Sequence, residues 1–324
     1  MGAEHVLLLA DDLTGALEAG ARFENSVVCL QAGRDSRVLV LDLESRHLAP
    51  EEAAARVRRA CAGARAGIIF KKTDSTLRGN IGAELGALPA GTIHYVPAYP
   101  AQGRTVRGGK LFVHGVPVQQ SPFAHDPTQP VATNDIRALL ERQGAPLQRI
   151  EIHDGSTDGD VHAAAKRILK EPAPRLAAGP AALAGELAAL LGLAPHTPDW
   201  PAVPACLVVN GSAHPASAAQ LLYARQHGLE RKGWRLGTRG EASGAPGALV
   251  LFGGDTAREI LRGFGDPTLH PLGEIMPGVP VSWFAHEGRR WTLVTKAGGF
   301  GEPDLLVRLH AMLNRGSAGK GTGK

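Results

Sequence analysis

Short apolar runs alternate with helix-like segments along almost the whole chain. This order predicts a parallel α/β architecture, because two parallel strands of one sheet need a long crossover, which a helix supplies. The expected strands are 6–10, 27–30, 38–43, 68–70, 93–96, 150–153, 206–209, 249–252 and 291–295. The expected helices are 15–24, 50–62, 81–88, 133–143, 158–169, 181–191, 215–227, 256–264 and 302–313. Ligands of parallel sheets bind beyond the carboxyl ends of strands, so polar motifs directly after a strand are candidate sites.

The length of 324 residues suits two domains of ~150 residues each. A stretch at 193–204, LAPHTPDWPAVP, is rich in proline and typical of a linker. The sequence therefore predicts an N-terminal domain at 1–195 and a shorter C-terminal domain at 204–315. The residues at 316–324 are rich in glycine and lysine and are expected to form a disordered tail.

Charge and cysteine content argue against several classes of protein. The net charge is +4 and no Lys/Arg run has the length of a nucleic-acid-binding arm, so no nucleic-acid partner is expected. The apolar run at 6–10 is too short for a membrane span and lacks the basic flank of a signal peptide, so no membrane partner is expected. Three cysteines without a C-x-x-C pair favour a reducing compartment, the cytoplasm by default. The oligomeric state is left open, with a homodimer among the states allowed.

Two adjacent carboxylates, Asp11 and Asp12, follow the first expected strand in the stretch ADDLTGALEAG. One aspartate could simply cap the next helix, a role that Thr14 could also fill. A carboxylate at a strand end could instead accept hydrogen bonds from sugar hydroxyls, act as a general base, or hold Mg²⁺ through water. Both interpretations stay open from the residues alone.

A second polar motif, FKKTDSTLRGN at 70–80, begins at the end of another expected strand. Lys71 and Lys72 should point to opposite faces if the strand continues, so one of them faces any site. Asp74 could cap the following helix or orient a hydroxyl, and Arg78 has a planar fork suited to a carboxylate or phosphate. A capped loop with surface ion pairs is the alternative.

A long segment at 96–127 follows the expected strand at 93–96 and contains Arg104 between glycine and proline residues. Its stretch LFVHGVPV resembles a hairpin. Loops of this length inside a domain are usually functional or disordered, and the apolar content of this one argues against disorder. Arg104 is therefore a candidate binding residue, with a plain surface charge as the alternative.

Glycine-rich turns follow three expected strands of the C-terminal domain. Backbone N–H groups at such a turn, together with the positive end of the next helix, suit a phosphate. One turn of this kind is weak evidence, but three in one domain predict a nucleotide cradle. Its candidate residues are Ser212 in NGSAH, Gly253, Gly254, Asp255 and Thr256 in GGDTA, and Gly298 and Gly299 in AGGFG.

Several familiar patterns are absent from the sequence. It has no G-x-x-x-x-G-K-[ST] loop and no G-x-G-x-x-G after its first strand. The segment HDGSTDGD at 153–160 lacks the final glutamate of a calcium loop. The thirteen histidines show no metal-binding spacing, so the ligands of any metal are unknown.

Taken together, the motifs resemble the four-carbon acid sugar kinase family. The matching segments occur in the family's order over nearly the whole chain: LADDLTGALEAG, KKTDSTLRGNIGAEL, PAYPAQGRTVRGGKLFVHGVPVQQSPFAHDP, GPAALAGELA, NGSA, GGDTA, GEIMPGVP and TKAGGFGEPDLL. The resemblance implies an enzyme that phosphorylates threonate, erythronate or 3-oxo-tetronate with ATP. It also implies two parallel-sheet α/β domains, the first binding the sugar acid and the second ATP, with the active site in the cleft between them.

Carried over to this chain, the resemblance assigns roles to individual residues. Phosphoryl transfer needs a carboxylate that orients the attacking hydroxyl, and cations or Mg²⁺ that offset phosphate charge. We expect Asp12 to be the base or hydroxyl-orienting group, with Asp74 as the second choice, and Arg78 to bind the substrate carboxylate. The other substrate residues are expected to be Asp11, Lys72, Ser75 and Arg104. ATP is expected on Ser212, Gly253, Gly254, Asp255, Thr256, Gly298 and Gly299.

Two departures from the family pattern concern the nucleotide half. About forty residues separate Gly211 from Gly253, where family members usually have a much longer segment. The chain also has Ala213–His214 after the NGS turn, where the family favours a second serine or cysteine, and Ala297 before the GGFG glycines, where the family favours a serine. The alternative function is therefore a catalytically weakened family member that binds a sugar acid without efficient turnover.

Overall fold

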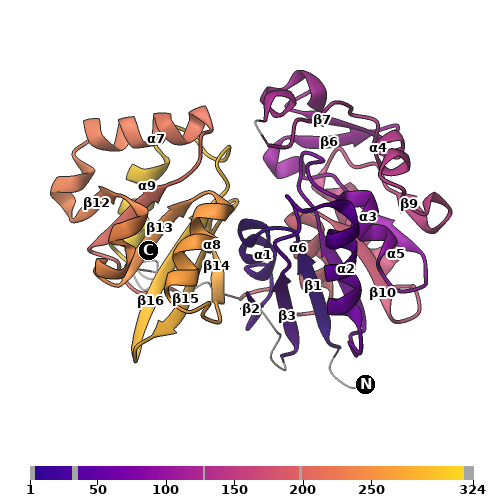
Figure 1. Cartoon of the computed structure of the whole chain (residues 1–324), viewed down its shortest axis with the longest axis horizontal. Helices are drawn as coiled ribbons and strands as arrows, with labels where there is room; N and C mark the ends of the chain where they lie inside the picture. The colour runs from indigo at the N-terminus through magenta and orange to yellow at the C-terminus, as the bar shows by residue number, and fades with distance from the viewer. Residues whose placement is uncertain (1–3, 31–35, 127, 197–198, 317–324) are drawn as a thin grey trace, which may run out of the picture. The chain divides into compact units, whose positions relative to one another are not determined.

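The structure, a computed structural model, describes residues 4–30, 36–126, 128–196 and 199–316. The chain divides into two compact units, Met1–Ala194 and Pro195–Lys324 (Figure 1). The division falls inside the proline-rich stretch at 193–204. The expected disordered tail lies outside the described residues from 317 onward.

A parallel sheet forms the centre of the N-terminal unit. Over the described residues it has seven strands in the order β2-β3-β1-β4-β10-β5-β9, with every neighbouring pair parallel. All residues of β1 and β4 are buried, so the sheet is covered on both faces, as parallel sheets usually are. The strands are β1 (Val6–Ala10), β2 (Val27–Cys29), β3 (Val38–Asp42), β4 (Ile68–Lys72), β5 (Ile93–Tyr95), β9 (Ile150–Ile152) and β10 (Arg175–Gly179).

Side-chain caps mark the start of some helices of this unit. Asp12 accepts a hydrogen bond from the Gly15 amide at 2.8 Å and caps α1. Thr157 and Asp160 form a reciprocal capping box at the start of α5. The helices are α1 (Leu13–Gly20), α2 (Pro50–Cys61), α3 (Ile81–Gly86), α4 (Ile136–Arg142), α5 (Asp158–Ile168) and α6 (Ala181–Leu190), with the 3₁₀ turn η4 (Leu147–Arg149).

The long segment after β5 forms a small antiparallel sheet rather than an open loop. Its strands are β6 (Arg104–Arg107), β7 (Lys110–Val113) and β8 (Val116–Pro117). Bridges join Val106 to Gly155 and Lys110 to Asp135. The same segment contains the 3₁₀ turns η1 (Pro100–Gln102), η2 (Val118–Gln120) and η3 (Pro122–His125).

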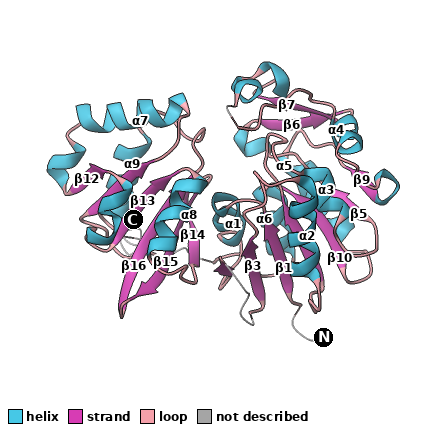
Figure 2. Cartoon of the chain, in the orientation of Figure 1, coloured by secondary structure: helices cyan, strands magenta, loops and turns pink. Residues whose placement is uncertain are grey.

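A mixed sheet forms the C-terminal unit, in the order β12-β11-β13-β16-β15-β14. The first four of these are parallel, and β15 and β14 join as antiparallel strands. The strands are β11 (Cys206–Asn210), β12 (Trp234–Gly237), β13 (Ala248–Phe252), β14 (His270–Met276), β15 (Val279–His286) and β16 (Arg289–Lys296). The helices are α7 (Pro215–Gln226), α8 (Gly254–Gly263) and α9 (Leu305–Leu313), with the 3₁₀ turns η5 (Leu229–Lys232) and η6 (Arg239–Gly244) (Figure 2).

The predicted α/β fold with two parallel-sheet domains is confirmed, and the differences are local. The strands β6, β10, β12, β14 and β15 were not predicted. The run RLAAG of β10 is rich in Ala and Gly, which β-propensity disfavours, and β14 contains Pro271 and Gly273. The helix α4 begins at Ile136 rather than 133, because Asp135 caps it through the Ala138 amide.

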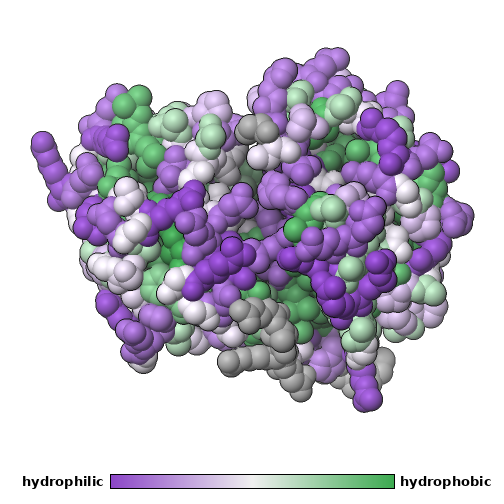
Figure 3. Space-filling view, viewed as in Figure 1, coloured by the Kyte–Doolittle hydropathy of each residue, from purple (hydrophilic) through white to green (hydrophobic). Residues whose placement is uncertain are grey.

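Few large apolar side chains are exposed. Among the described residues, the large hydrophobic side chains that are exposed are Val116 and Leu222, with exposed fractions of 43% and 58%. Figure 3 shows a largely hydrophilic face with scattered hydrophobic side chains. Within the described residues, no helix has the length and apolar character needed to cross a membrane.

Candidate functional site

The carboxyl ends of β1, β3 and β4 meet where the strand order switches direction. After β1 the chain forms β2 and β3 on one side of it, and then crosses to β4 on the other side. Such a switch leaves a crevice at the strand ends where ligands of α/β sheets bind. Asp11 and Asp12 follow β1, Arg46 follows β3, and Asp74 follows β4.

Arg46 is the centre of the charged cluster at this switch. Its Nε donates to Asp11 Oδ2 at 2.7 Å, and its Nη1 donates to Asp12 Oδ2 at 2.8 Å. Its Nη2 lies 3.8 Å from Asp74 Oδ2. Only 11% of the Arg46 side chain is exposed, so the guanidinium that the three carboxylates share has little contact with solvent.

Asp12 caps a helix, which was one of its two predicted alternatives, and its side chain is also partly exposed. Its Oδ1 caps α1, and its Oδ2 accepts from Thr14 Oγ1 at 2.6 Å. Its side chain is also the most exposed of the three carboxylates around Arg46, at 14% against 2% for Asp11 and 8% for Asp74. Asp12 is therefore the carboxylate of this cluster that solvent or a ligand reaches most easily.

Asp74 and Arg78 form a second centre next to the first. Arg78 Nη2 donates to Asp74 Oδ2 at 2.7 Å, and Arg78 Nη1 donates to Asp126 Oδ2 at 2.9 Å. Asp74 Oδ1 also accepts from the Thr76 amide at 2.8 Å. In this structure the fork of Arg78 thus binds two carboxylates of the protein, and its role with a substrate carboxylate stays a prediction.

The two lysines at the end of β4 bind different acids. Lys71 Nζ lies 3.0 Å from Glu84 Oε2, and both side chains are buried. Lys72 Nζ lies 3.8 Å from Glu18 Oε2. A Cβ at Gly15 would lie 2.6 Å from Asp12 Oδ1 and 2.9 Å from Lys72 Nζ, so Lys72 is the lysine beside Asp12.

Burial and charge act in opposite directions on the acids of this site. Burial alone would raise the pKa of Asp11, but Arg46, Lys71 and Lys72 together lower it. Burial likewise opposes the charge of Asp74, and Arg78 and Arg46 hold its pKa well below the usual range. Burial would lower the pKa of Arg46, but its three aspartates raise it well above the usual value. Asp11, Asp74 and Arg46 are therefore ionised at neutral pH.

The remaining predicted substrate residues are buried in the same unit. Ser75 follows Asp74 in the loop after β4 and is 8% exposed. Arg104, at the start of β6, is 4% exposed, and burial lowers its pKa. The guanidinium carbons of Arg78 and Arg104 lie 5.4 Å and 5.7 Å from the Phe123 ring centroid, so both cations border one aromatic face.

In the C-terminal unit, the three glycine-rich turns follow the neighbouring parallel strands β11, β13 and β16. Their backbones touch: the Gly211 amide donates to Phe252 O at 3.0 Å, and the Gly253 amide donates to Lys296 O at 3.0 Å. A Cβ at Gly298 would lie 2.0 Å from Ser212 Oγ, and one at Gly211 would lie 1.5 Å from Thr256 Oγ1. Glycine is needed at both positions because of this close approach.

These contacts bring together most of the predicted nucleotide residues. Ser212, Thr256 and Gly298 meet through the approaches just described, and Gly253 caps α8 with a φ of 95°. Gly254 and Asp255 lie in the first turn of α8. Gly299 borders His214, because a Cβ on it would lie 3.2 Å from His214 Nε2.

Lys296, the last residue of β16, holds the third turn in place. Its Nζ donates to the carbonyls of Gly298 at 2.8 Å, Phe300 at 2.9 Å and Ala297 at 3.0 Å. It also lies 4.5 Å from the Phe252 ring centroid. Burial lowers the pKa of this lysine to about 7.

A cavity of about 1140 Å³ lies beside β3 and α2 of the N-terminal unit. Among the described residues, its lining includes none of Asp11, Asp12, Arg46, Asp74 and Arg78. Converging charges, rather than concave volume, therefore identify the candidate site.

Both halves of the chain match models of known protein families. Residues 6–196 match the model of a sugar-binding N-terminal domain, and residues 237–306 match that of a nucleotide-binding C-terminal domain. The chain is 30% identical to the D-threonate kinase of Bordetella bronchiseptica, over 95% of this chain and 97% of that protein. The chain belongs to the four-carbon acid sugar kinase family.

Other relatives of this chain carry related names. A D-erythronate kinase of Heliobacterium modesticaldum is 38% identical over 43% of this chain and 36% of that protein. A 3-oxo-tetronate kinase of Cupriavidus necator is 26% identical over 92% of this chain and 94% of that protein. The alignment with the Bordetella enzyme runs over 393 positions and this chain has 324 residues, so at least 69 of those positions are gaps in this chain.

Solved structures share the kinase's fold. A Salmonella typhimurium LT2 protein superposes with a TM-score of 0.76 at 20% identity, over 95% of this chain and 99% of that chain. A Bordetella bronchiseptica protein, crystallised as a domain-swapped dimer with bound citrate, gives a TM-score of 0.52 at 26% identity, over 94% of this chain and 98% of that one.

Sequence reasoning missed two central residues of the kinase. Arg46 lies in an unremarkable loop, and only the pairing of β3 with β1 brings it to Asp11 and Asp12. Lys296 ends an apolar strand and is buried in the structure. The signal available in the sequence was a lysine directly after the apolar residues of that strand. Asp126 was part of a quoted motif, but its bond to Arg78 depends on the fold of the segment at 96–127.

Proposed function

We propose that this chain is a cytoplasmic ATP-dependent kinase that phosphorylates the terminal hydroxyl of threonate, erythronate or 3-oxo-tetronate. The observation that carries the proposal is the cluster of Asp11, Asp12, Arg46, Asp74 and Arg78 at the switch point of a parallel sheet. A small polyol acid needs carboxylate acceptors for its hydroxyls and a cation for its carboxylate, and this cluster has both.

The proposed substrate contacts follow from the charges. Arg78 binds the substrate carboxylate in exchange for Asp126, which it holds at 2.9 Å. Such an exchange replaces one carboxylate by another and keeps the local charge. Asp11, Lys72, Ser75 and Arg104 line the same site, and their burial limits how many waters a sugar acid has to displace.

The proposed chemistry uses Asp12 as the group that orients and deprotonates the hydroxyl. The hydroxyl oxygen forms a bond to the γ-phosphorus, the bond from that phosphorus to the bridging β–γ oxygen breaks, and ADP leaves. The hydroxyl proton passes to the carboxylate. Asp74 is the second choice, because the arginines that lower its pKa make it a weak proton acceptor.

For ATP we propose the three touching turns of the C-terminal unit. The residues are Ser212, Gly253, Gly254, Asp255, Thr256, Gly298 and Gly299. The N-terminus of α8, which follows Gly253, suits phosphate oxygens. Mg²⁺, when bound, would neutralise the charge on the phosphates. Among these residues Asp255 and Thr256 have the oxygen ligands that Mg²⁺ prefers.

An ADP-release assay with each four-carbon acid and Asp12→Asn tests the proposal. We expect kcat to fall by ~100-fold or more, as for the loss of a general base, with a smaller change in KM. Asp158→Asn, an exposed acid in the first turn of α5, is the matched control and should keep full activity. Full turnover by Asp12→Asn would remove Asp12 from this role.

A second candidate function is a weakened relative that binds the sugar acid without efficient turnover. It is favoured by the gaps in the alignment and by the nucleotide-domain match, which begins only at residue 237. Sugar-acid binding heat without nucleotide binding heat in calorimetry, together with no ADP release, would select this function.

We also propose a homodimer, supported by the domain-swapped dimer of the Bordetella protein. Light scattering of the purified chain should give twice the 33.9 kDa mass of one chain. A mass of one chain at micromolar concentration would reject the dimer.

A further inference from the structure

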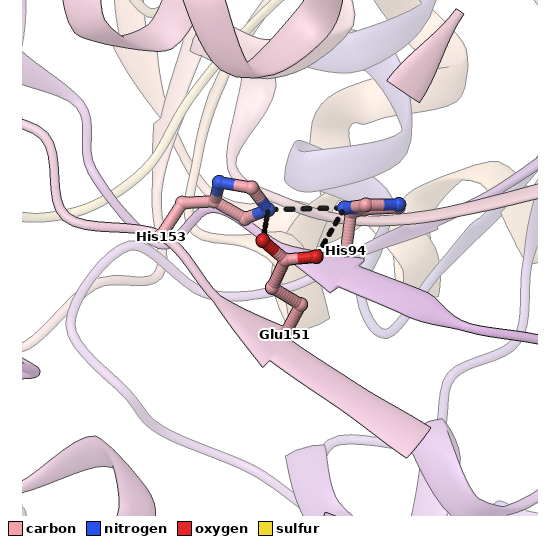
Figure 4. A group of neighbouring side chains, drawn as sticks. All are labelled: His94, Glu151 and His153. Atoms are coloured by element: carbon pink, nitrogen blue, oxygen red, sulfur yellow. Dashed lines mark hydrogen bonds and ion pairs between the residues drawn. The ribbon is translucent and has the colours of Figure 1, made fainter. Parts of the chain in front are cut away.

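His94, Glu151 and His153 form a compact cluster at one edge of the N-terminal sheet (Figure 4). His94 lies on β5, and Glu151 lies on the edge strand β9 directly beside it in the parallel register. His153 follows two residues later, so it projects to the same face as Glu151. The register joins residues that are 57 positions or more apart in the sequence, which is why histidine spacing gave no sign of them.

The distances between their ligand atoms suit one small cation. His94 Nδ1 lies 3.0 Å from His153 Nε2 and 3.6 Å from Glu151 Oε2, and His153 Nε2 lies 3.9 Å from Glu151 Oε1. Ligands of a tetrahedral Zn²⁺ at about 2.0–2.1 Å lie about 3.3 Å apart. Shifts of roughly half an ångström would therefore bring the three groups to that geometry.

We propose that His94, Glu151 and His153 bind a divalent transition-metal ion, Zn²⁺ by preference. Two imidazoles and one carboxylate are a ligand set that Zn²⁺ uses, with water in the fourth position. The metal would tie the edge strand β9 to β5.

The surroundings of His94 favour this assignment. Its side chain is 1% exposed, and its Nε2 is a buried atom without a hydrogen-bond partner. Glu171 Oε1 lies 3.9 Å from that Nε2. A carboxylate behind the far nitrogen of a metal-binding histidine is the usual second-shell partner, because it fixes the ring and raises its basicity.

One cation competes for the cluster. Arg167 Nη2, from the last turn of α5, lies 2.8 Å from Glu151 Oε1. Its side chain is 60% exposed, and exposed ion pairs of this kind contribute little free energy. A metal ion held by three ligands would therefore displace Arg167 into solvent.

Calorimetric titration of the tag-free, chelator-treated full chain with Zn²⁺ tests the proposal. We expect one equivalent to bind, a rise in Tm with Zn²⁺, and visible ligand-field bands when Co²⁺ replaces Zn²⁺. His153→Gln should weaken binding more than ~100-fold, and Glu171→Gln by about tenfold, within the ~10–100-fold range for a second-shell partner.

His162→Gln is the matched control for the loss of a histidine. His162 Nδ1 pairs with Glu186 Oε2 at 2.7 Å, so it is a histidine–carboxylate pair outside the cluster. It should bind Zn²⁺ as the wild type does, and Arg167→Gln should bind at least as tightly. Equal Zn²⁺ affinity for the wild type and His153→Gln, or no binding by the wild type, would overturn the proposal.

Discussion

The two candidate sites of this kinase lie at the same place in two α/β units and are built from different materials. In the N-terminal unit, buried side chains of opposite charge fill the carboxyl ends of β1, β3 and β4. In the C-terminal unit, bare backbone turns touch one another at the ends of β11, β13 and β16. The charged site has the side chains that a small acid with several hydroxyls needs, and in the C-terminal site the N-terminus of α8 presents amides that suit a phosphate.

The largest expected effect comes from removing the central cation of the charged site. Arg46→Gln leaves Asp11 and Asp12 buried without their shared partner, which should destabilise the N-terminal unit by ~3–5 kcal/mol. Arg239→Gln is the counterpart near the glycine turns. Arg239 contacts Thr256 Oγ1 at 3.1 Å and its side chain is 48% exposed. Its loss should change the free energy of unfolding by less than ~1 kcal/mol.

Urea unfolding of both variants, followed by hydrogen exchange in each unit, measures the two effects. Equal losses of stability in the two variants would contradict this difference between the two sites, because they would show that the glycine turns depend on charge as much as the cluster does.

Lys296 is the exception within the glycine-built site, and its pH dependence sharpens the contrast. Its folded pKa of about 7 lies below the ordinary 10.5. Between those values the unfolded chain binds more protons than the folded one, so stability rises with pH across this window. Below about pH 7 both states hold the proton, and the slope vanishes. Relative to Lys296→Met, the wild type should therefore gain stability between about pH 7 and pH 10.

Urea midpoints of the wild type and Lys296→Met across this range measure the gain. Lys166→Met, at an exposed position of α5, controls for the loss of a lysine. A constant difference across the range would mean that the carbonyls of Ala297, Gly298 and Phe300 keep the ammonium charged.

How far the sequence predicts each site depends on what builds it. The motifs after β1 and β4 contain Asp11, Asp12, Asp74 and Arg78, so their place at strand ends could be deduced from apolar runs alone. Arg46 could not be deduced, because its role depends on β3 lying beside β1, and strand order is a property of the whole sheet.

The glycine turns were visible in the sequence, but not the reason for each glycine. Only the pairing of β11 with β13 places Gly211 against Thr256. The antiparallel pair β15–β16 was not predicted, although its strands are joined by the dipeptide Glu287–Gly288. Both residues have the positive φ that a two-residue hairpin turn requires.

Smaller effects are expected where a methyl group is added. Gly211→Ala would place a Cβ 1.5 Å from Oγ1 and 2.6 Å from Cβ of Thr256, a stiff side chain that is 1% exposed. The turn must move, and we expect KM for ATP to rise about tenfold or more, equivalent to ~1.4 kcal/mol. Gly240→Ala, with nothing within 4 Å of the new Cβ, should leave KM unchanged.

The N-terminal counterpart, Gly15→Ala, tests the same idea from the other side. There the new Cβ would meet Asp12 Oδ1 and Lys72 Nζ, which are the ends of flexible side chains. We expect a change in KM for the sugar acid and not for ATP. Steady-state kinetics with each substrate varied in turn separates the two, and an effect of Gly15→Ala on ATP alone would contradict the assignment of the halves.

The smallest effect is expected where the two units use the same device. Thr157 caps α5, accepting from the Asp160 amide at 3.2 Å, while its own amide donates to Asp160 Oδ2 at 2.9 Å. Thr238 forms the equivalent box with Glu241 at η6. Thr157→Ala should lower the stability of α5 by ~1 kcal/mol, read from hydrogen exchange of its first-turn amides.

Thr238→Ala should have a smaller effect, because η6 is a short 3₁₀ segment with little helix to lose. A larger effect at Thr238 would mean that η6 supports the neighbouring turns through its Arg239–Thr256 bond, and the C-terminal site would then depend on side chains as well as on backbone.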